Sequence, residues 1–373
     1  MKKIPQKRDF FYLAINKRLF YTRFMRLYIH ILTRNSRRFL PDLLKSLHKQ
    51  TYQDFTVRIL DNGSADGTVE FLQEKFPGTL VARNLRNIGF AEGHNQLIRY
   101  TLDHLPATEK DNAAIVWMND DMILHPNALA ELASAWRKNK GIGAIQPKIY
   151  RAFGQHASDE EIVEVIKSDI LDSTGMSLTK SWRMVERGAG EMDKGQYDKQ
   201  TDVFAPSGAM ALMPINVIED LMIGTELFDK DFFAYREDCD LGLRLRKRGW
   251  RVVFVPKAIV YHYRGMYGAA KMSFKERILN RRRHKSDYLK ALATRNQWFV
   301  LLKNLTLADF ILFFPYISAA ELSRLLYIMF FEPKTVKVAV SSLSLLPKMW
   351  KKRKIILTSA KVKESELRKY ARN

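Results

Sequence analysis

The stretch Ala113-Ala114-Ile115-Val116-Trp117-Met118-Asn119-Asp120-Asp121 decides the fold. Its apolar run is typical of a buried strand, and the run ends in two adjacent acids. Such runs alternate with amphipathic segments from residue 27 onward, which predicts an α/β fold with a largely parallel, doubly wound sheet and right-handed crossovers. Ligands of such sheets bind beyond the carboxyl ends of the strands, where Asp120 and Asp121 would lie.

The periodicity also gives expected element bounds. Strands are predicted at 27–33, 56–60, 79–82, 113–118, 142–149, 251–255 and 259–263, and helices at 37–49, 66–75, 91–104 and 126–138. Residues 151–200 lose this regularity and are predicted to be a loop, either a lid or an acceptor loop. Order returns over residues 203–213, a helix runs through 241–245, and only helices are expected beyond about residue 273.

Charge divides the 373-residue chain into three parts. Residues 1–26 carry a formal charge of +7 and residues 271–373 carry +16, so the body over 27–270 is nearly neutral although the whole chain carries +22. We therefore expect a basic aromatic N-terminal segment, a globular domain and a basic, apolar, helical C-terminal region. The single cysteine, Cys239, excludes an internal disulfide and fits a reducing compartment.

The two basic flanks are also apolar and aromatic, which favours an anionic membrane surface over nucleic acid or a solvated helical face. Residues 310–331 contain only Glu321 and Arg324 as charges, spaced to pair on one helix face. Pro315 is expected to interrupt this run, so an interfacial segment is favoured over a membrane-spanning helix. Lys17, Arg18 and Arg23 break up the N-terminal apolar residues, so no export signal is expected.

Adjacent carboxylates at the end of a buried strand repel each other unless a cation or a proton intervenes. Asp120 and Asp121 therefore predict a site for Mg²⁺ or Mn²⁺, with a helix N-cap as the alternative. His262 follows another strand and could complete the coordination, or it could be a buried core histidine. A cation here would bridge a donor diphosphate and neutralise the charge of the leaving group.

Two further acids follow strand-like runs. Asp61 ends a strand and can accept hydrogen bonds from a nucleobase or a ribose, and no Gly-x-Gly-x-x-Gly for a dinucleotide cofactor follows the first strand. The segment Phe232-Phe233-Ala234-Tyr235-Arg236-Glu237-Asp238 opens a helix with acids, which the helix dipole favours. A base must accept the proton of an acceptor hydroxyl, and Asp238 is the residue chosen for it.

Together these motifs resemble the family 2 inverting glycosyltransferases, in particular their bacterial rhamnosyltransferase and galactofuranosyltransferase branch. The resemblance spans roughly residues 27–303 and rests on motifs in a fixed order. They are Thr33-Arg34-Asn35-Ser36, Asp61-Asn62-Gly63-Ser64, Asn87-Ile88-Gly89-Phe90-Ala91, Asn119-Asp120-Asp121, Ala205-Pro206-Ser207-Gly208-Ala209, Phe232 to Asp238, Val260-Tyr261-His262 and Arg295-Asn296-Gln297-Trp298.

The resemblance implies a GT-A fold and a single displacement at the anomeric carbon with inversion. It implies Asp238 as the catalytic base and Asp121 and His262 as ligands of Mg²⁺ or Mn²⁺. It places the remaining candidate residues at the substrates: Thr33, Asp61, Gly89, Asn95, Asp120, Ser207, Gly208 and Glu237. The donor would be a dTDP- or UDP-sugar, and rhamnose or a similar sugar would be transferred.

The acceptor expected from the membrane-directed flanks is a lipid-linked glycan at the cytoplasmic face of the cell membrane, in the synthesis of a cell-surface polysaccharide. Nucleic acid is not expected as a partner. A nucleotidyl- or phosphoryl-transfer enzyme is one alternative, although the phosphate-binding glycine loop and lysine that it needs are not seen after the first strand. A non-catalytic membrane- or nucleic-acid-binding protein on a transferase scaffold is another.

Overall fold

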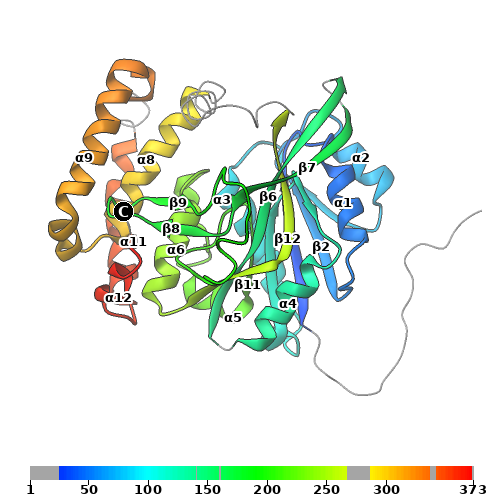
Figure 1. Cartoon of the computed structure of the whole chain (residues 1–373), viewed down its shortest axis with the longest axis horizontal. Coiled ribbons are helices and arrows are strands. Elements are labelled where there is room, and N and C mark those ends of the chain that lie inside the picture. The colour runs from blue at the N-terminus through cyan, green and yellow to red at the C-terminus, as the bar shows by residue number, and fades with distance from the viewer. Residues whose placement is uncertain (1–24, 140, 159–160, 267–285, 337–341, 372–373) are drawn as a thin grey trace, which may run out of the picture.

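The computed structural model describes residues 25–139, 141–158, 161–266, 286–336 and 342–371. The expected N-terminal segment falls almost wholly outside these residues, as does the start of the C-terminal region. In the described part, a mixed β-sheet is flanked by helices, and further helices gather beside one end of it (Figure 1). The α/β prediction with a helical C-terminal region is confirmed.

The sheet has the strand order β10-β12-β6-β11-β4-β1-β2-β3, with β5 beside β12 and β7 beside β6. Its strands are β1 (Arg26–Thr33), β2 (Phe55–Asp61), β3 (Leu80–Arg83), β4 (Ala113–Asn119), β5 (Met122–Leu124), β6 (Ile142–Ser158), β7 (Glu161–Ser173), β10 (Asp202–Val203), β11 (Met210–Pro214) and β12 (Arg251–Met266). A separate hairpin joins β8 (Met176–Leu178) to β9 (Met184–Glu186). The β4-β1-β2-β3 half is parallel, as predicted, whereas β11 enters antiparallel between β4 and β6.

Helices cover both faces of the sheet because successive side chains of its central strands point to opposite sides. Leu27, Ile29 and Ile31 of β1 pack with α1 (Leu40–His48) and α4 (Ala128–Lys138). Tyr28, between them in sequence, belongs to the core on the other face, with α3 (Phe90–Asp103), α5 (Ile215–Leu221) and α6 (Glu237–Lys247). The remaining helix of the domain is α2 (Thr68–Lys75).

A third core attaches the C-terminal helices to the β8–β9 hairpin and α6. It contains Trp182, Phe232, Phe299, Phe313 and Met349. These helices are α8 (Asp287–Asn304), α9 (Leu307–Phe331), α11 (Leu346–Thr358) and α12 (Glu364–Arg368). They lie together at the left of Figure 1, on the opposite side of the sheet domain from α1 and α2.

Two expectations from the sequence are wrong. Residues 151–200 are not a loop, because β6 continues to Ser158, β7 pairs antiparallel with it, and the β8–β9 hairpin follows. Pro315 does not interrupt its helix, since α9 runs through it. A proline inside a helix removes one backbone hydrogen bond, and α9 nevertheless continues on both sides of Pro315.

Candidate functional site

The candidate site lies where the central parallel strands end. Thr33 at the end of β1 is in register with Asp61 at the end of β2, and Leu32 is in register with Asn119 of β4. Asp120 follows directly, and its Oδ2 accepts a hydrogen bond from the backbone N–H of Arg34 at 3.2 Å. The fold therefore brings Thr33, Asp61 and Asp120 to one edge of the sheet, as the sequence predicted.

Asp61 is fully buried, and local contacts fix its carboxylate. Its Oδ2 accepts from the backbone N–H of Ser64 at 3.1 Å, and the Ser64 hydroxyl donates to Oδ1. The guanidinium of Arg83, half exposed, lies 3.6 Å away. The fixed carboxylate can only accept hydrogen bonds, as from a hydroxyl or an N–H group, while the half-exposed Arg83 beside it can bind an anionic group.

His262 on β12 is held between two carboxylates. Its Nδ1 lies 2.9 Å from Oδ2 of Asp172, and its Nε2 lies 3.0 Å from Oδ1 of Asp121. Although burial and the charge of Arg264 oppose it, Asp121 and Asp172 raise the pKa of His262 overall. His262 is thus neither an apolar core histidine nor an isolated ligand, because it connects β12 to the acids after β4.

Asp172, on β7, was not predicted and is the centre of this arrangement. Nε of Arg264 lies 3.0 Å from each of its oxygens, and Nε of Arg151 lies 3.3 Å from Oδ1. Burial alone would raise the pKa of Asp172, but Arg264 and His262 hold it far below its usual range. No local pattern marks Asp172, because residues 151–200 are predicted to be a loop and β7 lies among them.

These residues fit a divalent cation. When Nδ1–H of His262 donates to Asp172, the lone pair on Nε2 faces Oδ1 of Asp121, a buried oxygen that accepts no hydrogen bond. Two facing lone pairs repel unless a proton or a cation lies between them. Among the described residues, no three His, Cys, Asp or Glu side chains form a metal cluster.

The two acids after β4 differ in environment. Burial and the charge of Asp121 raise the pKa of Asp120 to about 6. Burial also opposes ionisation of Asp121, but His262 and then Arg264 outweigh it and lower the pKa of Asp121. Asp121 therefore favours the ionised form more than Asp120 does, and it lies beside His262, while Asp120 accepts a hydrogen bond from the Arg34 backbone.

Asp238 lies in the first turn of α6, and the loop before β11 reaches it. Its Oδ2 accepts from the backbone N–H of Gly208 at 3.1 Å, and its Oδ1 accepts from Cys239 N–H at 2.8 Å. A Cβ at position 208 would lie 2.9 Å from Oδ2, so only glycine allows this approach. The carbonyl of the next residue, Ala209, accepts a hydrogen bond from the backbone N–H of Asn119 at 2.9 Å. This bond connects the loop at Asp238 to the strand end that carries Asp120 and Asp121.

The loop before α6 has an unusual backbone. Phe233, Tyr235 and Arg236 have φ values of 63°, 72° and 72°, a region that costs about 1–3 kcal/mol for residues with a side chain. The amide of Asn296 on α8 compensates by donating to the carbonyls of Phe232, Ala234 and Tyr235 at 2.7–2.9 Å. The conformation that presents Asp238 thus depends on a helix that follows it by about 50 residues in the chain.

Two glutamates flank Asp238. Glu237 is buried, its Oε2 has no hydrogen-bond partner, and burial together with the charge of Asp238 raises its pKa to about 8. Glu186 of β9, which the sequence did not single out, accepts from the Ser207 hydroxyl at 2.8 Å. Burial, then the charges of Asp238 and Asp172, raises the pKa of Glu186 to about 7. Glu186 is therefore close enough to both Asp172 and Asp238 for the charges of both to act on it.

The remaining predicted residues have mainly structural contacts. Gly89 has φ of 88°, and a Cβ there would lie 2.5 Å from the carbonyl oxygen of Phe233. The amide of the buried Asn95 is occupied by the backbone of Leu227 and Phe228, to which it makes bonds of 2.7–3.1 Å. Gly89 therefore adjoins the loop before α6, whereas the Asn95 side chain is bonded through both its oxygen and its nitrogen to the backbone of Leu227 and Phe228.

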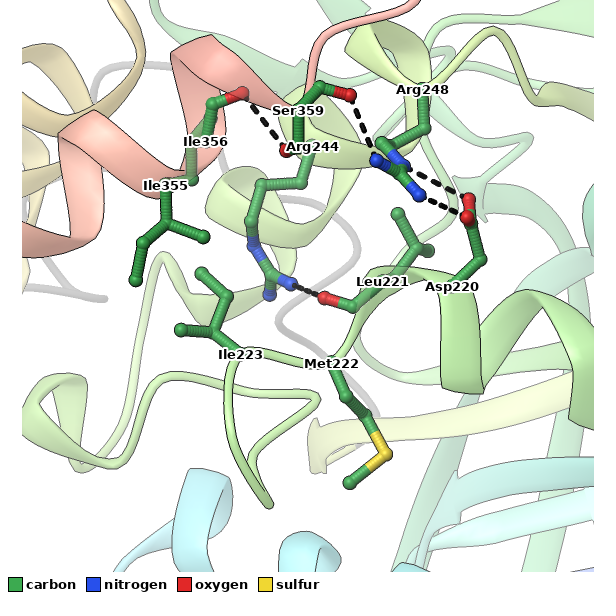
Figure 2. Close-up of a pocket in the computed structure, with 9 residues that line it drawn as sticks. All are labelled: Asp220, Leu221, Met222, Ile223, Arg244, Arg248, Ile355, Ile356 and Ser359. Atoms are coloured by element: carbon green, nitrogen blue, oxygen red, sulfur yellow. Dashed lines mark hydrogen bonds and ion pairs between the residues drawn. The ribbon is translucent and has the colours of Figure 1, made fainter.

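A cavity of about 240 Å³ lies elsewhere, between α5, α6 and α11 (Figure 2). Its two arginines are already paired: Nε of Arg248 is 3.0 Å from Asp220, and Nη1 of Arg244 donates to the carbonyl of Leu221 at 2.7 Å. None of the predicted site residues lines this cavity. This cavity lies between the C-terminal helix α11 and the helices α5 and α6 of the sheet domain, and it is not the candidate site.

Comparisons with known proteins agree with this geometry. The sequence profile described as "Glycosyltransferase like family 2" matches residues 25–285. N-acetylglucosaminyl-diphospho-decaprenol L-rhamnosyltransferase of Mycobacterium tuberculosis is 27% identical over 237 residues, which cover 60% of this chain and 72% of that protein. The same match is found in two strains.

Among solved structures, GalNAc-T7 with UDP, GalNAc and Mn²⁺ superposes with a TM-score of 0.52 at 14% identity. The match covers 76% of this chain but only 48% of GalNAc-T7, so this chain corresponds to about half of that protein. At this identity the likeness concerns the fold, and it confirms the expected GT-A architecture.

Proposed function

Since the chain belongs to the glycosyltransferase-like family 2, we propose that it is an inverting, metal-dependent transferase that acts on a nucleotide sugar. The sugar would be rhamnose or a similar one, and the donor a dTDP- or UDP-sugar. The acceptor would be a lipid-linked glycan, in the synthesis of a cell-surface polysaccharide. The named relative, an L-rhamnosyltransferase that acts on a diphospho-decaprenol glycan, supports this choice of sugar and acceptor.

One observation carries the proposal: the loop Ser207-Gly208-Ala209 joins the acids after β4 to Asp238. Gly208 donates to Asp238, and Ala209 accepts from Asn119. A displacement at an anomeric carbon is helped by a cation beside the leaving diphosphate and by a carboxylate beside the attacking hydroxyl, because the diphosphate leaves from one face of that carbon while the acceptor attacks from the other. Asp121 and His262 would hold the cation, and Asp238 is the carboxylate. A non-catalytic scaffold would need neither, and the phosphate-binding glycine loop and lysine of a nucleotidyl- or phosphoryl-transfer enzyme are not seen after the first strand.

Each residue then has a defined part. Asp121 and His262 would hold Mg²⁺ or Mn²⁺, which when bound neutralises charge on the diphosphate. Backbone N–H groups orient the carboxylate of Asp238, which takes the proton of the acceptor hydroxyl as its oxygen forms the new bond to the anomeric carbon. The bond between that carbon and the diphosphate oxygen breaks, and the nucleoside diphosphate leaves.

The proposed function also divides the chain into three parts. We assign the transferase to residues 27–270, the basic, apolar helical region to 271–373, and a further basic segment to 1–26. The reaction would take place at the cytoplasmic face of the cell membrane, where a polyprenyl-linked acceptor is presented.

The test uses the purified full chain with Mg²⁺ or Mn²⁺, a panel of dTDP-, UDP- and GDP-sugars, and a polyprenyl diphosphate-linked acceptor. We expect acceptor-dependent release of nucleoside diphosphate from one donor, inverted configuration in the product by NMR, and loss of release on adding EDTA. Transfer that persists in EDTA would overturn the metal assignment. Absence of release from every donor, with the chain folded, would overturn the transferase.

A further inference from the structure

Helix α9 exposes an apolar face that is large for a folded protein. Among the described residues it is the one helix long and apolar enough to cross a membrane, with a mean hydropathy of 1.3 and 22% of its apolar window buried. Its exposed large side chains are Leu307, Phe310, Ile311, Leu312, Phe314, Tyr316, Leu322, Leu325, Leu326, Met329, Phe330 and Phe331. Contiguous apolar surface on this scale marks a contact with a protein or a membrane.

The first half of α9 is fastened to polar parts of the protein. Oδ1 of Asp309 is 2.6 Å from Nε of Arg368 on α12, and Lys180 lies over the ring of Tyr316 at 5.1 Å. Nε1 of Trp298 on α8 donates to Glu321 at 2.9 Å. These partners belong to elements that pack in the third core, so residues 309–321 are held against the protein on one side and cannot be enclosed by lipid.

The length of α9 after residue 321 decides whether this helix can span a membrane or can only lie in one leaflet. Residues 322–331 form ten further residues of helix with a length of about 15 Å, and among them Ile328 is buried against the protein while Leu326 and Phe330 are exposed. The hydrocarbon core of a bilayer is about 30 Å thick. The end of α9 can therefore reach into one leaflet but cannot cross the membrane while the contacts at 309–321 persist.

Charge identifies the occupant of this face. In the described part of residues 307–358, every exposed charged residue is a lysine: Lys334, Lys348, Lys351 and Lys354. The acids Asp309, Glu321 and Glu332 are buried or half-buried. A second copy of the chain would place lysines against lysines, whereas an anionic bilayer offers both apolar depth and negative charge.

We propose that the exposed apolar face of α9, in a helical region whose exposed charges are lysines, binds an anionic lipid bilayer and lies in one leaflet without crossing it. The proposal concerns a binding surface and needs neither the donor nor the acceptor of the proposed reaction. Its test measures binding to vesicles that contain no sugar nucleotide or polyprenyl glycan, so its failure is distinct from failure of the transferase proposal.

The experiment is co-sedimentation of the full chain with phosphatidylcholine vesicles, with and without phosphatidylglycerol. Leu326→Glu/Phe330→Glu is compared with Leu85→Glu, which makes the same kind of change at a fully exposed leucine on the sheet domain. We expect the double variant to lose more than tenfold in partition coefficient and the control to be unchanged. The partition coefficient of Lys351→Gln/Lys354→Gln should fall about tenfold on vesicles with phosphatidylglycerol and stay unchanged on vesicles without it. High salt should lower the partition coefficient of the native chain in the same way.

Orientation is tested with Ala308→Cys and Lys334→Cys, which flank α9, because the native Cys239 is buried. A membrane-impermeant maleimide added outside sealed vesicles should label both positions without detergent. Labelling of either position by the same maleimide enclosed in the vesicle lumen would show a spanning helix and overturn the proposal. Equal binding of Leu326→Glu/Phe330→Glu and Leu85→Glu, or loss of self-association instead of lipid binding in the double variant, would overturn it as well.

Discussion

The two ends of the candidate site are held by different parts of the chain. The metal side, Asp121, His262 and Asp172, is positioned by β4, β12 and β7, which belong to one sheet. The base side, Asp238, depends on a loop with three residues at positive φ that Asn296 of α8 holds through its carbonyls. The sheet builds one half, and the C-terminal helices complete the other.

Substitutions in the two halves should therefore lower activity in different ways. Damage on the metal side weakens a ligand, and more metal can compensate for it by mass action. Damage on the base side releases a strained backbone, and no ligand concentration restores it. The following experiments separate these two kinds of loss.

The largest effect is expected from Asp238→Asn. Removing the base should lower kcat by about 10²–10⁴-fold while the donor still binds, because the amide keeps the shape of the side chain but cannot take the proton. Acceptor-dependent release of nucleoside diphosphate and donor affinity by calorimetry would be measured side by side. A variant with wild-type kcat would remove Asp238 from the mechanism.

Asn296→Ala comes next. Loss of its three bonds to the loop should lower kcat by about 10- to 100-fold with unchanged Mn²⁺ affinity, because misplacement of a catalytic group by about 1 Å costs that much. Excess Mn²⁺ should give no recovery. Asn304→Ala serves as the control, since Asn304 is equally buried on α8 but bonds to Asp240 rather than to the loop. Equal kcat losses in both variants would point to general destabilisation instead.

Asp172→Asn tests the metal side. Without the carboxylate that orients Nδ1 of His262, Mn²⁺ affinity should fall by about 10- to 100-fold, measured by electron paramagnetic resonance of free Mn²⁺. Saturating Mn²⁺ should return kcat close to that of the native chain. Failure of this recovery would mean that Asp172 acts beyond His262.

The smallest effect concerns stability and pH at Glu237. Its pKa of about 8 lies above that of an unfolded glutamate, so between about pH 4.5 and 8 the folded state keeps a proton that the unfolded state loses. Stability therefore falls across this window as pH rises. Glu237→Gln should raise Tm by a few degrees at pH 8 and hardly at all near pH 4.5. The exposed Glu366→Gln is the control, and a Tm difference for Glu237→Gln that does not depend on pH would contradict this reading.

The sequence was most informative where local pattern and burial agree. The strands β1, β2 and β4 are buried runs followed by polar residues, so the edge with Thr33, Asp61 and Asp120 could be predicted. Asp172 could not, because β7 is a strand only through its pairing with β6. Asn296 was part of a recognised motif, but its role arises from contacts across the chain that no local spacing encodes.

The dependence of the strained loop on α8 has a consequence for the order of synthesis. A ribosome that has released residues up to 266 has delivered the whole sheet and every acid of the site, yet Asn296 is still to come. The nascent enzyme is therefore expected to stay silent until α8 emerges, and α9 follows α8 after Asn304 within three residues. Catalytic competence and the helix proposed to face lipid would leave the ribosome almost together, which would keep an active transferase from accumulating away from its acceptor.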